Sequence, residues 1–542
     1  MTMFCFIFPR KMYRRDVVFS IFSLLFGAFT STSLFIFPDY LSSIYGYDNK
    51  NVFVVYLKLF SCSIGLIGFC LYIYNLYSKN NKLFYMFLFG ICYFFVGLFW
   101  LNQSMHIYGG LPLILSLSMC LLFSIYNGLF FVLSLLISPR FVFIPFSFVL
   151  CEWLRGNLFT GFPWLNLGYS LVDTPFNFIA EYFGVYGVEF LSIFFIAVFI
   201  LFINFLNLKN FNYKRFFQYG LLLSFFLIFI LSAHNYNAIN IKSNSNENDF
   251  ISVKVIQGAI SQDKKFVREN ILANIDFHLD LMLKNNDNFI PDLIITPETA
   301  FPVVINNLPM YVYEKMLEYS KKYSTAILFG AAGVLNDQYT NSLFFISNDE
   351  LSPKIYYKYH LVPFGEFVPY GFKWFVNNLI MPMGDFARGG LVQNSFTFYK
   401  NGKQFKISAN ICYEVLFGEE MAQVNYKNNP HIFVNSTNLG WFGNSGLVQF
   451  LNISRMRALE LKKSIVIANN SGISAVILPN AKVEKWINIK TPGVLTFKLP
   501  INSEISFYTK YKNMPILSII LFGFTILLYY YFFSRKNIHI AI

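Results

Sequence analysis

Charged residues are scarce in this sequence. Asp, Glu, Lys and Arg make up 13% of the 542 residues, against about 25% in an average soluble protein. Hydrophobic residues make up 55% of the chain and the mean hydropathy is +0.48. This balance excludes a chain that is soluble throughout. It predicts a polytopic membrane protein that also carries a substantial soluble part.

Familiar metal and nucleotide motifs are also missing. The sequence has no His-Glu-x-x-His, no Cys-x-x-Cys and no glycine-rich phosphate loop followed by a helix, and its six histidines are scattered. We therefore predict no metal and no cofactor, and a nucleotide-binding fold is not favoured. The formal charge of +13 is compatible with nucleic-acid binding. Many basic residues, however, lie in short loops between apolar runs, so we attribute the charge to membrane topology and predict no nucleic-acid partner.

Apolar runs of the length that crosses a bilayer, about 20 residues, recur along the chain. We predict spans near 16–37, 53–76, 83–101, 111–137, 141–157, 180–206, 216–234 and 514–533. The basic run from Arg10 to Arg15 resembles the start of a signal peptide, but no small-residue cleavage site follows the first apolar run,. The first span is therefore expected to be retained, which gives a membrane bundle of about eight spans.

Lysine and arginine in the short loops predict the orientation. With a cytoplasmic N-terminus, the inner segments hold twelve basic residues, namely Arg10, Lys11, Arg14, Arg15, Lys79, Lys82, Arg140, Lys209, Lys214, Arg215, Arg535 and Lys536, and the outer short loops hold Lys50 and Arg155. Cytoplasmic loops carry such an excess. We therefore predict a seven-span bundle over 1–234, a domain outside the membrane over 235–505, and an eighth span with a short cytoplasmic tail over 506–542.

Several charged residues lie within the predicted spans or at their ends. Glu152 and Arg155 lie three positions apart, which allows either a structural ion pair or a site that meets a lipid headgroup or the incoming substrate,. Both interpretations stay open at this point. Lys58 is expected to extend its amine to the membrane surface. Glu181 and Glu189 are expected to be solvated at the membrane interface.

Short apolar strands alternate with helical patterns after about residue 235. Strands are predicted at 251–257, 292–296, 325–330, 341–346, 354–359, 405–411, 431–435, 464–468 and 474–478. Helices are predicted at 264–285, 310–323, 413–425 and 446–462. This alternation predicts a layered α/β or α+β domain with its own core.

Cys412 is the only cysteine in this polar part, because the other six lie in the apolar part of the chain. An apolar strand runs into it and a helical pattern follows directly. Such a thiol could be a small, inert core residue. It could also be a nucleophile that the strand aims and that the helix N-terminus favours as the thiolate. The residues around it decide for the nucleophile.

Two further reactive groups stand where predicted strands end, which is where α/β folds place their sites. Glu298 ends one strand, and Lys358 ends another, with Glu366 eight residues further on. A thiol needs a carboxylate to accept its proton. An ammonium and a backbone N–H can stabilise the oxyanion that forms when a carbonyl is attacked. We predict Cys412 as nucleophile, Glu298 as base, and Lys358 with the Tyr413 amide as oxyanion donors.

These residues carry a resemblance to a known family. Glu298, Lys358 and Cys412 resemble the Glu–Lys–Cys triad of the nitrilase, or carbon–nitrogen hydrolase, superfamily. With eight spans around it, the chain is similar to the bacterial apolipoprotein N-acyltransferases. The most specific motif is Lys-Tyr-His-Leu-Val-Pro-Phe-Gly-Glu-Phe-Val-Pro at 358–369. Further matching motifs lie at 257–258, 296–298, 385–386, 411–414, 441–443 and 455–460, and in the loops 108–110 and 161–164.

The resemblance implies a nitrilase-like α-β-β-α sandwich on the outer, periplasmic face of the bacterial inner membrane. It implies that Cys412 takes an acyl chain from a phospholipid as a thioester. The α-amino group of the diacylglyceryl-cysteine at an apolipoprotein N-terminus would then attack that thioester, in the last step of lipoprotein maturation. Glu298 would move the protons. The implied partners are a phospholipid donor, a diacylglyceryl apolipoprotein acceptor and membrane lipids, and an eight-span monomer is the default.

The resemblance also implies supporting residues. Glu366 and Glu414 match family carboxylates that support the lysine and the geometry of the site. Phe266, which stands where the family often has Trp, is expected to keep an apolar contact over the site, and Trp441 and Phe442 are expected to bind substrate. Three positions depart from the family pattern, namely Leu439, Phe450 and Ile467, where an acidic residue, His and Arg are usual. Since the triad is intact, activity is expected.

Two other functions fit parts of the sequence. A membrane-tethered amidase would use water in place of the amine, but an enzyme for a soluble amide needs no seven-span platform. A transporter whose outer domain binds solute is disfavoured, because the predicted spans lack paired helices broken by Gly or Pro in matching halves. Acyl transfer is therefore the favoured function, with residues 364–395 as a candidate flap over the site.

Overall fold

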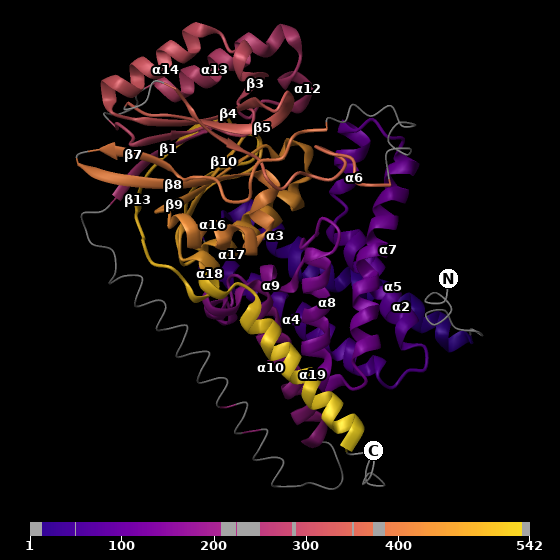
Figure 1. The fold of residues 1–542 in the computed structure, drawn as a ribbon. Coiled ribbons are helices and arrows are strands. Elements are labelled where there is room, and N and C mark those ends of the chain that lie inside the picture. Colours follow the sequence, from indigo (N-terminus) through magenta and orange to yellow (C-terminus); the bar gives the residue numbers. More distant parts are fainter. Residues whose placement is uncertain are drawn as a thin grey trace.

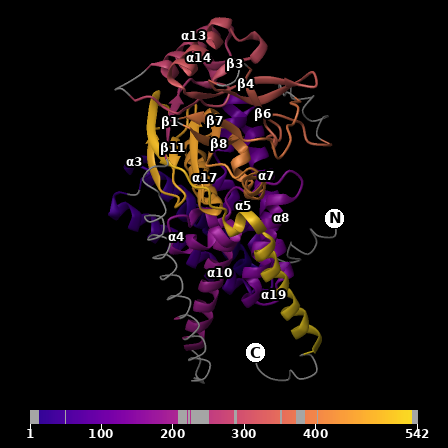
Figure 2. The same ribbon diagram turned by 60° about the vertical axis from the view of Figure 1, so that its left-hand side comes forward.

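The computed structural model describes residues 13–48, 50–206, 250–284, 289–348, 352–371, 385–400 and 402–533, together with the single residues 220 and 224. A bundle of helices forms one end of the molecule, and two stacked β-sheets with their covering helices form the other (Figure 1). In the turned view, α10 (Ala180–Leu206) and α19 (Met514–Phe533) both run away from the sheets (Figure 2). The two parts are therefore arranged end to end.

The bundle is built from helices of very different lengths. Its elements are α2 (Arg14–Ser31), η1 (Thr32–Ile36), α3 (Phe37–Tyr45), α4 (Val52–Leu76), α5 (Lys82–Gly97), α6 (Leu101–Gln103), η2 (Ser104–Tyr108), α7 (Leu113–Ile137), η3 (Phe141–Phe143), α8 (Ile144–Asn157), α9 (Leu167–Ser170), η4 (Pro175–Ile179) and α10. The chain returns to it through α18 (Phe507–Tyr511) and α19.

Four helical stretches in the described residues are long and apolar enough to cross a membrane, namely Arg14–Tyr45, Val52–Leu76, Leu113–Ile137 and Pro175–Asn204. A fifth results if Lys82–Gly97 and Leu101–Tyr108, which meet at 61°, form one span. The predicted total of eight is not confirmed. α8 has only 14 residues, the apolar stretch Met514–Tyr529 is also short, and the predicted span 216–234 lies almost wholly outside the described residues.

Two sheets stack in the domain after residue 250. The first has the strand order β13-β1-β2-β4-β5-β6 with β3 paired to β4, and the second has the order β12-β11-β10-β9-β8-β7. Their bounds are β1 (Phe250–Gln257), β2 (Leu293–Ile295), β3 (Phe301–Val304), β4 (Ala326–Leu335), β5 (Gln338–Ile346), β6 (Lys354–Tyr357), β7 (Phe396–Lys400), β8 (Lys403–Ile411), β9 (Ile432–Thr437), β10 (Ser464–Asn469), β11 (Ser474–Ile477), β12 (Val483–Ile487) and β13 (Gly493–Pro500).

Helices cover both outer faces of this pair of sheets, which gives the expected α-β-β-α layering (Figure 1). The first sheet is covered by α13 (Ile271–Leu283) and α14 (Met310–Tyr323), and the second by α16 (Gly418–Asn428) and α17 (Asn444–Leu461). α14 packs mainly one face on its sheet, as a covering helix does, whereas α17 lies between the sheet and the bundle and is buried on most sides,. The buried side chains of α14 are Val312, Met316, Tyr319 and Ser320.

All nine predicted strands are present, but four strands were not predicted. β3, β7, β12 and β13 are short or partly exposed strands, so their apolar signal is weak. The helix predicted over 264–285 is divided into α12 (Gln262–Lys265), η5 (Arg268–Asn270) and α13, because Val267 has extended backbone angles. The helix predicted at 413–425 is replaced by η7 (Cys412–Leu416) and α16.

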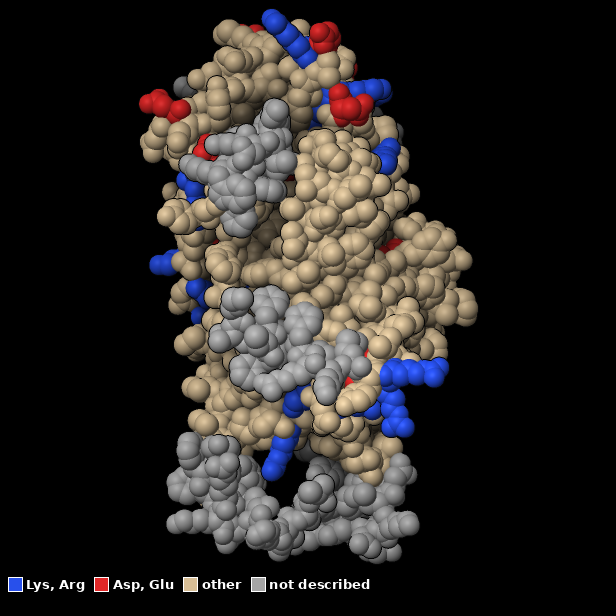
Figure 3. All heavy atoms as spheres, turned by 90° about the vertical axis from the view of Figure 1, so that its right-hand side faces the viewer, with Lys and Arg blue, Asp and Glu red and all other residues tan. Residues whose placement is uncertain are grey.

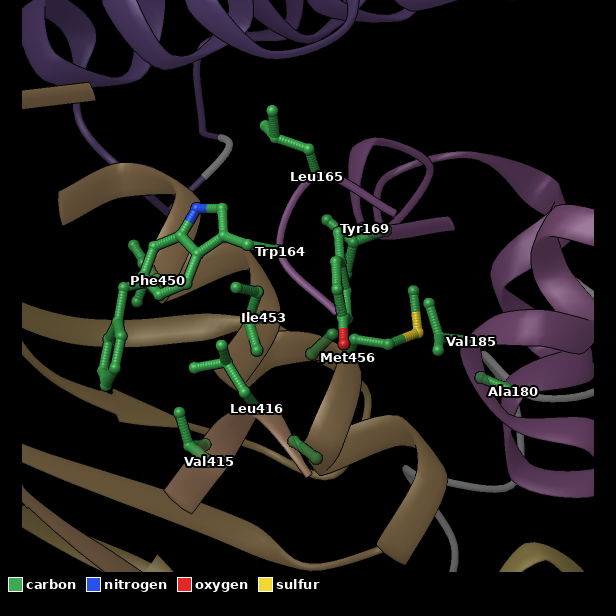
Figure 4. Packing of buried hydrophobic residues seen from close by; sticks show 14 of the residues in the cluster. Trp164, Leu165, Tyr169, Ala180, Val185, Val415, Leu416, Phe450, Ile453 and Met456 are labelled. Atoms are coloured by element: carbon green, nitrogen blue, oxygen red, sulfur yellow. The ribbon is translucent and has the colours of Figure 1, made fainter. Parts of the chain in front are cut away.

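The bundle and the sheet domain share one hydrophobic core. Trp164 and Tyr169 come from the bundle and pack among Leu416, Phe450 and Met456 of the domain (Figure 4). Fully burying an apolar side chain contributes about 1.5–3 kcal/mol, so a seam of many such contacts is strong. The domain is therefore packed onto the bundle and is not a loosely tethered unit.

Glu152 and Arg155 are buried at the end of the bundle that faces the sheets. Arg155 donates from Nε to Glu152 at 2.9 Å and from Nη2 at 2.6 Å, and it also donates to the carbonyl oxygens of Phe162 and Trp164. This geometry favours the structural ion pair over a site that meets a lipid headgroup or the incoming substrate. It holds the loop after α8 against the domain, because Trp164 is one of the residues in the shared core.

The predictions for three other charges in the bundle are wrong. Glu181 is 7% exposed and pairs with Lys462 at 2.6 Å, so it is not solvated at the interface. Glu189 is fully buried and accepts a hydrogen bond from Asn166 Nδ2 at 2.9 Å, so it is not solvated at the interface. Lys58 is 5% exposed and lies near the charges of Asp39 and Asp173, so its amine does not extend to the membrane surface. Polar partners and opposite charges that the tertiary fold supplies outweigh the tendency of a lone charge to seek water.

We predict that Arg155→Met strongly destabilises the folded protein. The substitution leaves the Glu152 carboxylate buried without its partner, which costs about 3–5 kcal/mol. The free energy of unfolding, measured in detergent, should fall accordingly. Adding Glu152→Gln should recover part of the loss, whereas Arg140→Met, at an exposed position, should have little effect. Unfolding of Arg155→Met at the wild-type midpoint would contradict this role.

Candidate active site

Cys412 is held in a strained position between β8 and η7. Its φ of 51° lies in the left-handed region, which costs a non-glycine residue on the order of 1–3 kcal/mol and is commonest at functional sites. Hydrogen bonds hold it there. Asn435 Nδ2 donates to the Cys412 carbonyl at 3.1 Å, and Glu414 accepts from the Ile411 N–H at 2.6 Å. The thiol therefore has a rigid backbone support.

The thiol is not activated by a helix N-terminus, and this part of the prediction is wrong. The segment that begins with Cys412 is a 3-10 turn of five residues, and the regular helix α16 begins only at Gly418. Burial, together with the charge of Glu298, raises the pKa of Cys412 to about 12, and Lys358 opposes the shift. The resting cysteine is a thiol, so it needs the base that the sequence predicted.

Lys358 lies between two carboxylates. Its Nζ is 2.8 Å from Glu366 Oε1 and 3.8 Å from Glu298 Oε1, and its side chain is 1% exposed. Burial by itself would lower the pKa of Lys358, but Glu366 and Glu298 raise it well above the usual lysine value. The side chain therefore remains an ammonium at every physiological pH and can stabilise an oxyanion.

Both oxygens of the Glu298 carboxyl group are held. Oε1 accepts from Asn341 Nδ2 at 2.5 Å, and Oε2 accepts from the Asn438 N–H at 2.8 Å. Burial raises the pKa of Glu298, Lys358 counteracts this shift, and the like charge of Glu366 adds to it. A carboxyl group whose pKa is raised toward neutrality is suited to accept and return a proton.

Glu414 connects the cysteine turn to the lysine strand. Besides the Ile411 N–H, its carboxylate accepts from the N–H groups of Tyr359 and His360 at 2.7 and 3.1 Å, and from the Tyr356 hydroxyl at 2.9 Å. Burial raises its pKa to about 7 in spite of these donors. Glu414 thus fixes the position of Cys412 relative to Lys358, and its supporting role in a reaction stays a prediction.

The three predicted reactive residues therefore lie in one buried cluster, and Glu366 lies beside Lys358 in it. Tyr413 is buried, and its hydroxyl donates to the Gly161 carbonyl at 3.1 Å, which ties the site to the bundle. The role of its amide stays a prediction.

The aromatic residues predicted to bind substrate differ in exposure. Phe266 is 52% exposed and Trp441 is 38% exposed, whereas Phe442 is half-buried with its ring centroid 4.2 Å from that of Trp100. The three departures from the family pattern, Leu439, Phe450 and Ile467, are all buried in the core.

Sequence reasoning missed Asn341. Its Nδ2 donates to Glu298 at 2.5 Å and also to Glu366 at 2.8 Å, so one amide aligns both carboxylates. The signal was present, since the buried part of β5 begins with the polar run Thr340-Asn341-Ser342 directly before the apolar residues 343–346. A buried polar run of this kind requires partners, and here the partners belong to the site.

Known proteins resemble both parts of the chain. Residues 54–198 match the family model of the apolipoprotein N-acyltransferase N-terminal domain, and residues 255–506 match that of the carbon-nitrogen hydrolases. The apolipoprotein N-acyltransferase of Ralstonia nicotianae is 34% identical over 79% of this chain and 81% of its own length. The chain belongs to the apolipoprotein N-acyltransferase family. The similarity is not limited to one relative, because the apolipoprotein N-acyltransferase of Haemophilus influenzae is 32% identical over 84% of this chain and 87% of its own.

Family membership confirms the predicted resemblance and the carbon-nitrogen hydrolase domain. The two matched segments contact each other in the shared core. Trp164, in the segment that matches the N-terminal domain, packs on Phe450, in the segment that matches the hydrolases. The Lys-Tyr-His-Leu-Val-Pro-Phe-Gly-Glu run at 358–366 of this chain has a structural explanation. It carries the ammonium and its nearest carboxylate on one turn.

We predict that Glu366→Gln shifts the pH profile downward. Glu366 raises the pKa of Glu298, so removing its charge should let Glu298 ionise at lower pH. The acid limb of kcat/KM should move down by about one pH unit, the usual effect of one nearby charge. Glu420→Gln is the control, because Glu420 pairs with His360 at 2.9 Å and does not touch Glu298. An upward shift would contradict the arrangement of charges.

Proposed function

We propose that the protein transfers an acyl chain from a membrane phospholipid, through a thioester on Cys412, to the α-amino group of the N-terminal diacylglyceryl-cysteine of apolipoproteins. The observation that carries the proposal is the cluster of a thiol, a carboxylate and an ammonium, buried in a domain that is packed on a bundle of membrane helices. The names of the relatives agree with this activity.

The first half-reaction forms the thioester. Glu298 accepts the proton of the Cys412 thiol, and Sγ attacks the ester carbonyl carbon of the phospholipid. The negative charge that develops on the carbonyl oxygen is stabilised by the Lys358 ammonium and by the Tyr413 amide. The intermediate collapses as the bond from carbon to the glycerol oxygen breaks. Glu298 returns its proton to that oxygen, and a lysophospholipid leaves.

In the second half-reaction the apolipoprotein amine is the nucleophile and Cys412 is the leaving group. The amine of the apolipoprotein attacks the thioester carbonyl carbon, with its surplus proton passing to Glu298. The same ammonium and amide stabilise the second oxyanion. The bond from carbon to sulfur then breaks, Cys412 takes the proton back from Glu298, and the amide product leaves. Free enzyme is restored with atoms and protons balanced, and no cofactor is required.

The apolar rings at the site have a use in this scheme. Phe266 and Trp441 are partly exposed although they are large and apolar, and exposed apolar groups near a site are typical of surfaces that bind apolar ligands. We assign contacts with the acyl chains to these two residues and to Phe442. Trp441 is held by the bundle, because its carbonyl oxygen accepts from the Ser104 hydroxyl at 2.7 Å and its ring lies 5.3 Å from that of Tyr108.

The proposed topology places the catalytic domain, residues 235–505, on the outer face of the bacterial inner membrane. The seven-span bundle over 1–234 and the eighth span within 506–542 carry it, and the protein acts as a monomer. The distribution of basic residues supports this orientation. On the face drawn in Figure 3, charged side chains of both signs lie over the sheet domain, and several basic side chains also lie toward the far end of the bundle.

We expect Cys412→Ala to abolish acyl transfer and to leave a folded membrane protein. The assay follows a labelled phospholipid with and without a diacylglyceryl peptide. Wild type should give labelled N-acyl peptide and a mass increase on Cys412, and Cys120→Ala, which removes a buried bundle thiol, should behave as wild type. Equal release of free fatty acid with and without peptide, and no acylated peptide, would instead identify a hydrolase.

The orientation can be tested with single cysteines introduced at exposed positions. Tyr370 lies on the sheet domain, and Arg140 lies just after the C-terminal end of α7, so the two test variants are Tyr370→Cys and Arg140→Cys. A thiol reagent that cannot cross membranes should label Tyr370→Cys in intact spheroplasts, and Arg140→Cys only after lysis. The opposite pattern would overturn the proposed topology.

A further inference from the structure

A second buried lysine lies behind the catalytic base. Lys265 ends the short helix α12 and is 1% exposed. Its Nζ donates to the Glu298 carbonyl oxygen at 3.0 Å and to the Thr299 hydroxyl at 3.0 Å. The proposed reaction gives this side chain no task, although burying an ammonium is costly unless it has a function or compensating partners.

The segment that Lys265 holds is a strained turn. Thr299 has a φ of 47°, which is unfavourable for a β-branched residue,. The turn is closed by the Ala300 N–H, which donates to the Pro297 carbonyl at 3.2 Å. It lies directly on Gly330, where a Cβ atom would be 2.6 Å from the Pro297 oxygen and 2.7 Å from the Thr299 nitrogen. Gly330 thus supports the turn on one side, and the Lys265 ammonium binds its carbonyl and hydroxyl oxygens.

Lys265 also affects the charge balance at the base. The charged and titratable groups that face the Glu298 carboxyl are Lys358, Glu366, Cys412 and Lys265. Burial raises the pKa of Glu298, and Lys265 acts with Lys358 to lower it. The groups that face Lys265 are Glu298 and His278. Burial lowers the pKa of His278 to about 4, so the imidazole is neutral near pH 7 and adds no charge.

We propose that Lys265 is a positioning residue for the catalytic base, which fixes the Glu298–Thr299 turn and keeps the Glu298 carboxyl ionised. This inference rests on the proposed role of Glu298 as the base. Burial lowers the pKa of Lys265 to about 7, so the ammonium is present in the acidic range, where Glu298 must resist protonation.

The chain supplies a matched comparison. Lys254, on β1, is also a buried lysine at 4% exposure, and its Nζ donates to the carbonyl oxygens of Met282 and Lys284 at 2.7 and 2.6 Å. Its environment resembles that of Lys265, with burial again lowering the pKa, to about 8. It is not among the groups whose charge shifts the pKa of Glu298. If buried lysines serve only stability here, the two should respond alike to substitution.

The test measures kcat/KM for acyl transfer against pH with full-length enzyme in detergent, using Lys265→Met, Lys265→Arg and Lys254→Met. In Lys265→Met, the acid limb should move up by about one pH unit, and activity below the limb should fall about tenfold. Lys265→Arg keeps the charge and should retain the wild-type limb. Lys254→Met should lose stability without moving the limb. An unshifted limb in Lys265→Met, or an equal shift in Lys254→Met, would overturn the inference.

A second measurement is independent of the acyl transfer reaction. The rate at which iodoacetamide alkylates Cys412, followed by peptide mass spectrometry, should show an inflection where Glu298 titrates, because its charge alters the pKa of the thiol. Lys265→Met should move this inflection up, and Lys254→Met should not. If Lys265→Met does not accumulate in the membrane, Lys265→Gln replaces it as the neutral variant. Wild type without acyl transfer would refute the proposed function, whereas an unmoved inflection refutes only the role of Lys265.

Discussion

The ion pairs of Lys358 with Glu298 and Glu366 are the interaction on which the site depends. Two carboxylates this close together in a buried place would repel each other, and one would take up a proton. The ammonium, 2.8 Å from Glu366 and 3.8 Å from Glu298, and the Asn341 amide between them make the arrangement possible. Since truncating one partner would leave uncompensated buried charge, the cluster has to be completed as a unit when the domain folds.

The bundle takes part in holding this cluster. The Tyr413 hydroxyl donates to the Gly161 carbonyl, and His360 Nε2 lies 3.0 Å from the Thr160 carbonyl, so one loop of the bundle contacts both the cysteine and the lysine segments. Gln449 of α17 accepts from the indole N–H groups of Trp100 and Trp164 at 3.1 and 2.6 Å. The membrane part therefore positions the site as well as bringing it to lipid.

The grouping of Glu298, Lys358 and Cys412 could be predicted because each stands at the end of an apolar strand, which is a local pattern. The surroundings of the charges could not. A single charged residue in an apolar run, such as Lys58 or Glu189, is predicted to reach water. Only the tertiary fold brings Asp39 and Asp173 near Lys58, and Asn166 to Glu189. The same applies to the turn after Cys412, where a helical pattern predicted thiolate stabilisation. In the structure, the backbone there instead forms a single 3-10 turn held by Glu414.

In the proposed reaction, burial explains how a thiol with a pKa of about 12 can serve as the nucleophile. Ionising Cys412 to solvent would create a new charge in a dry site. Passing its proton to Glu298 only moves a negative charge from one neighbour of Lys358 to another, so the net charge of the cluster is unchanged and little desolvation cost is added. The reverse transfer restores the thiol when the product leaves. A high thiol pKa and a raised carboxyl pKa therefore belong together, and they keep the nucleophile protonated until a substrate carbonyl is in place.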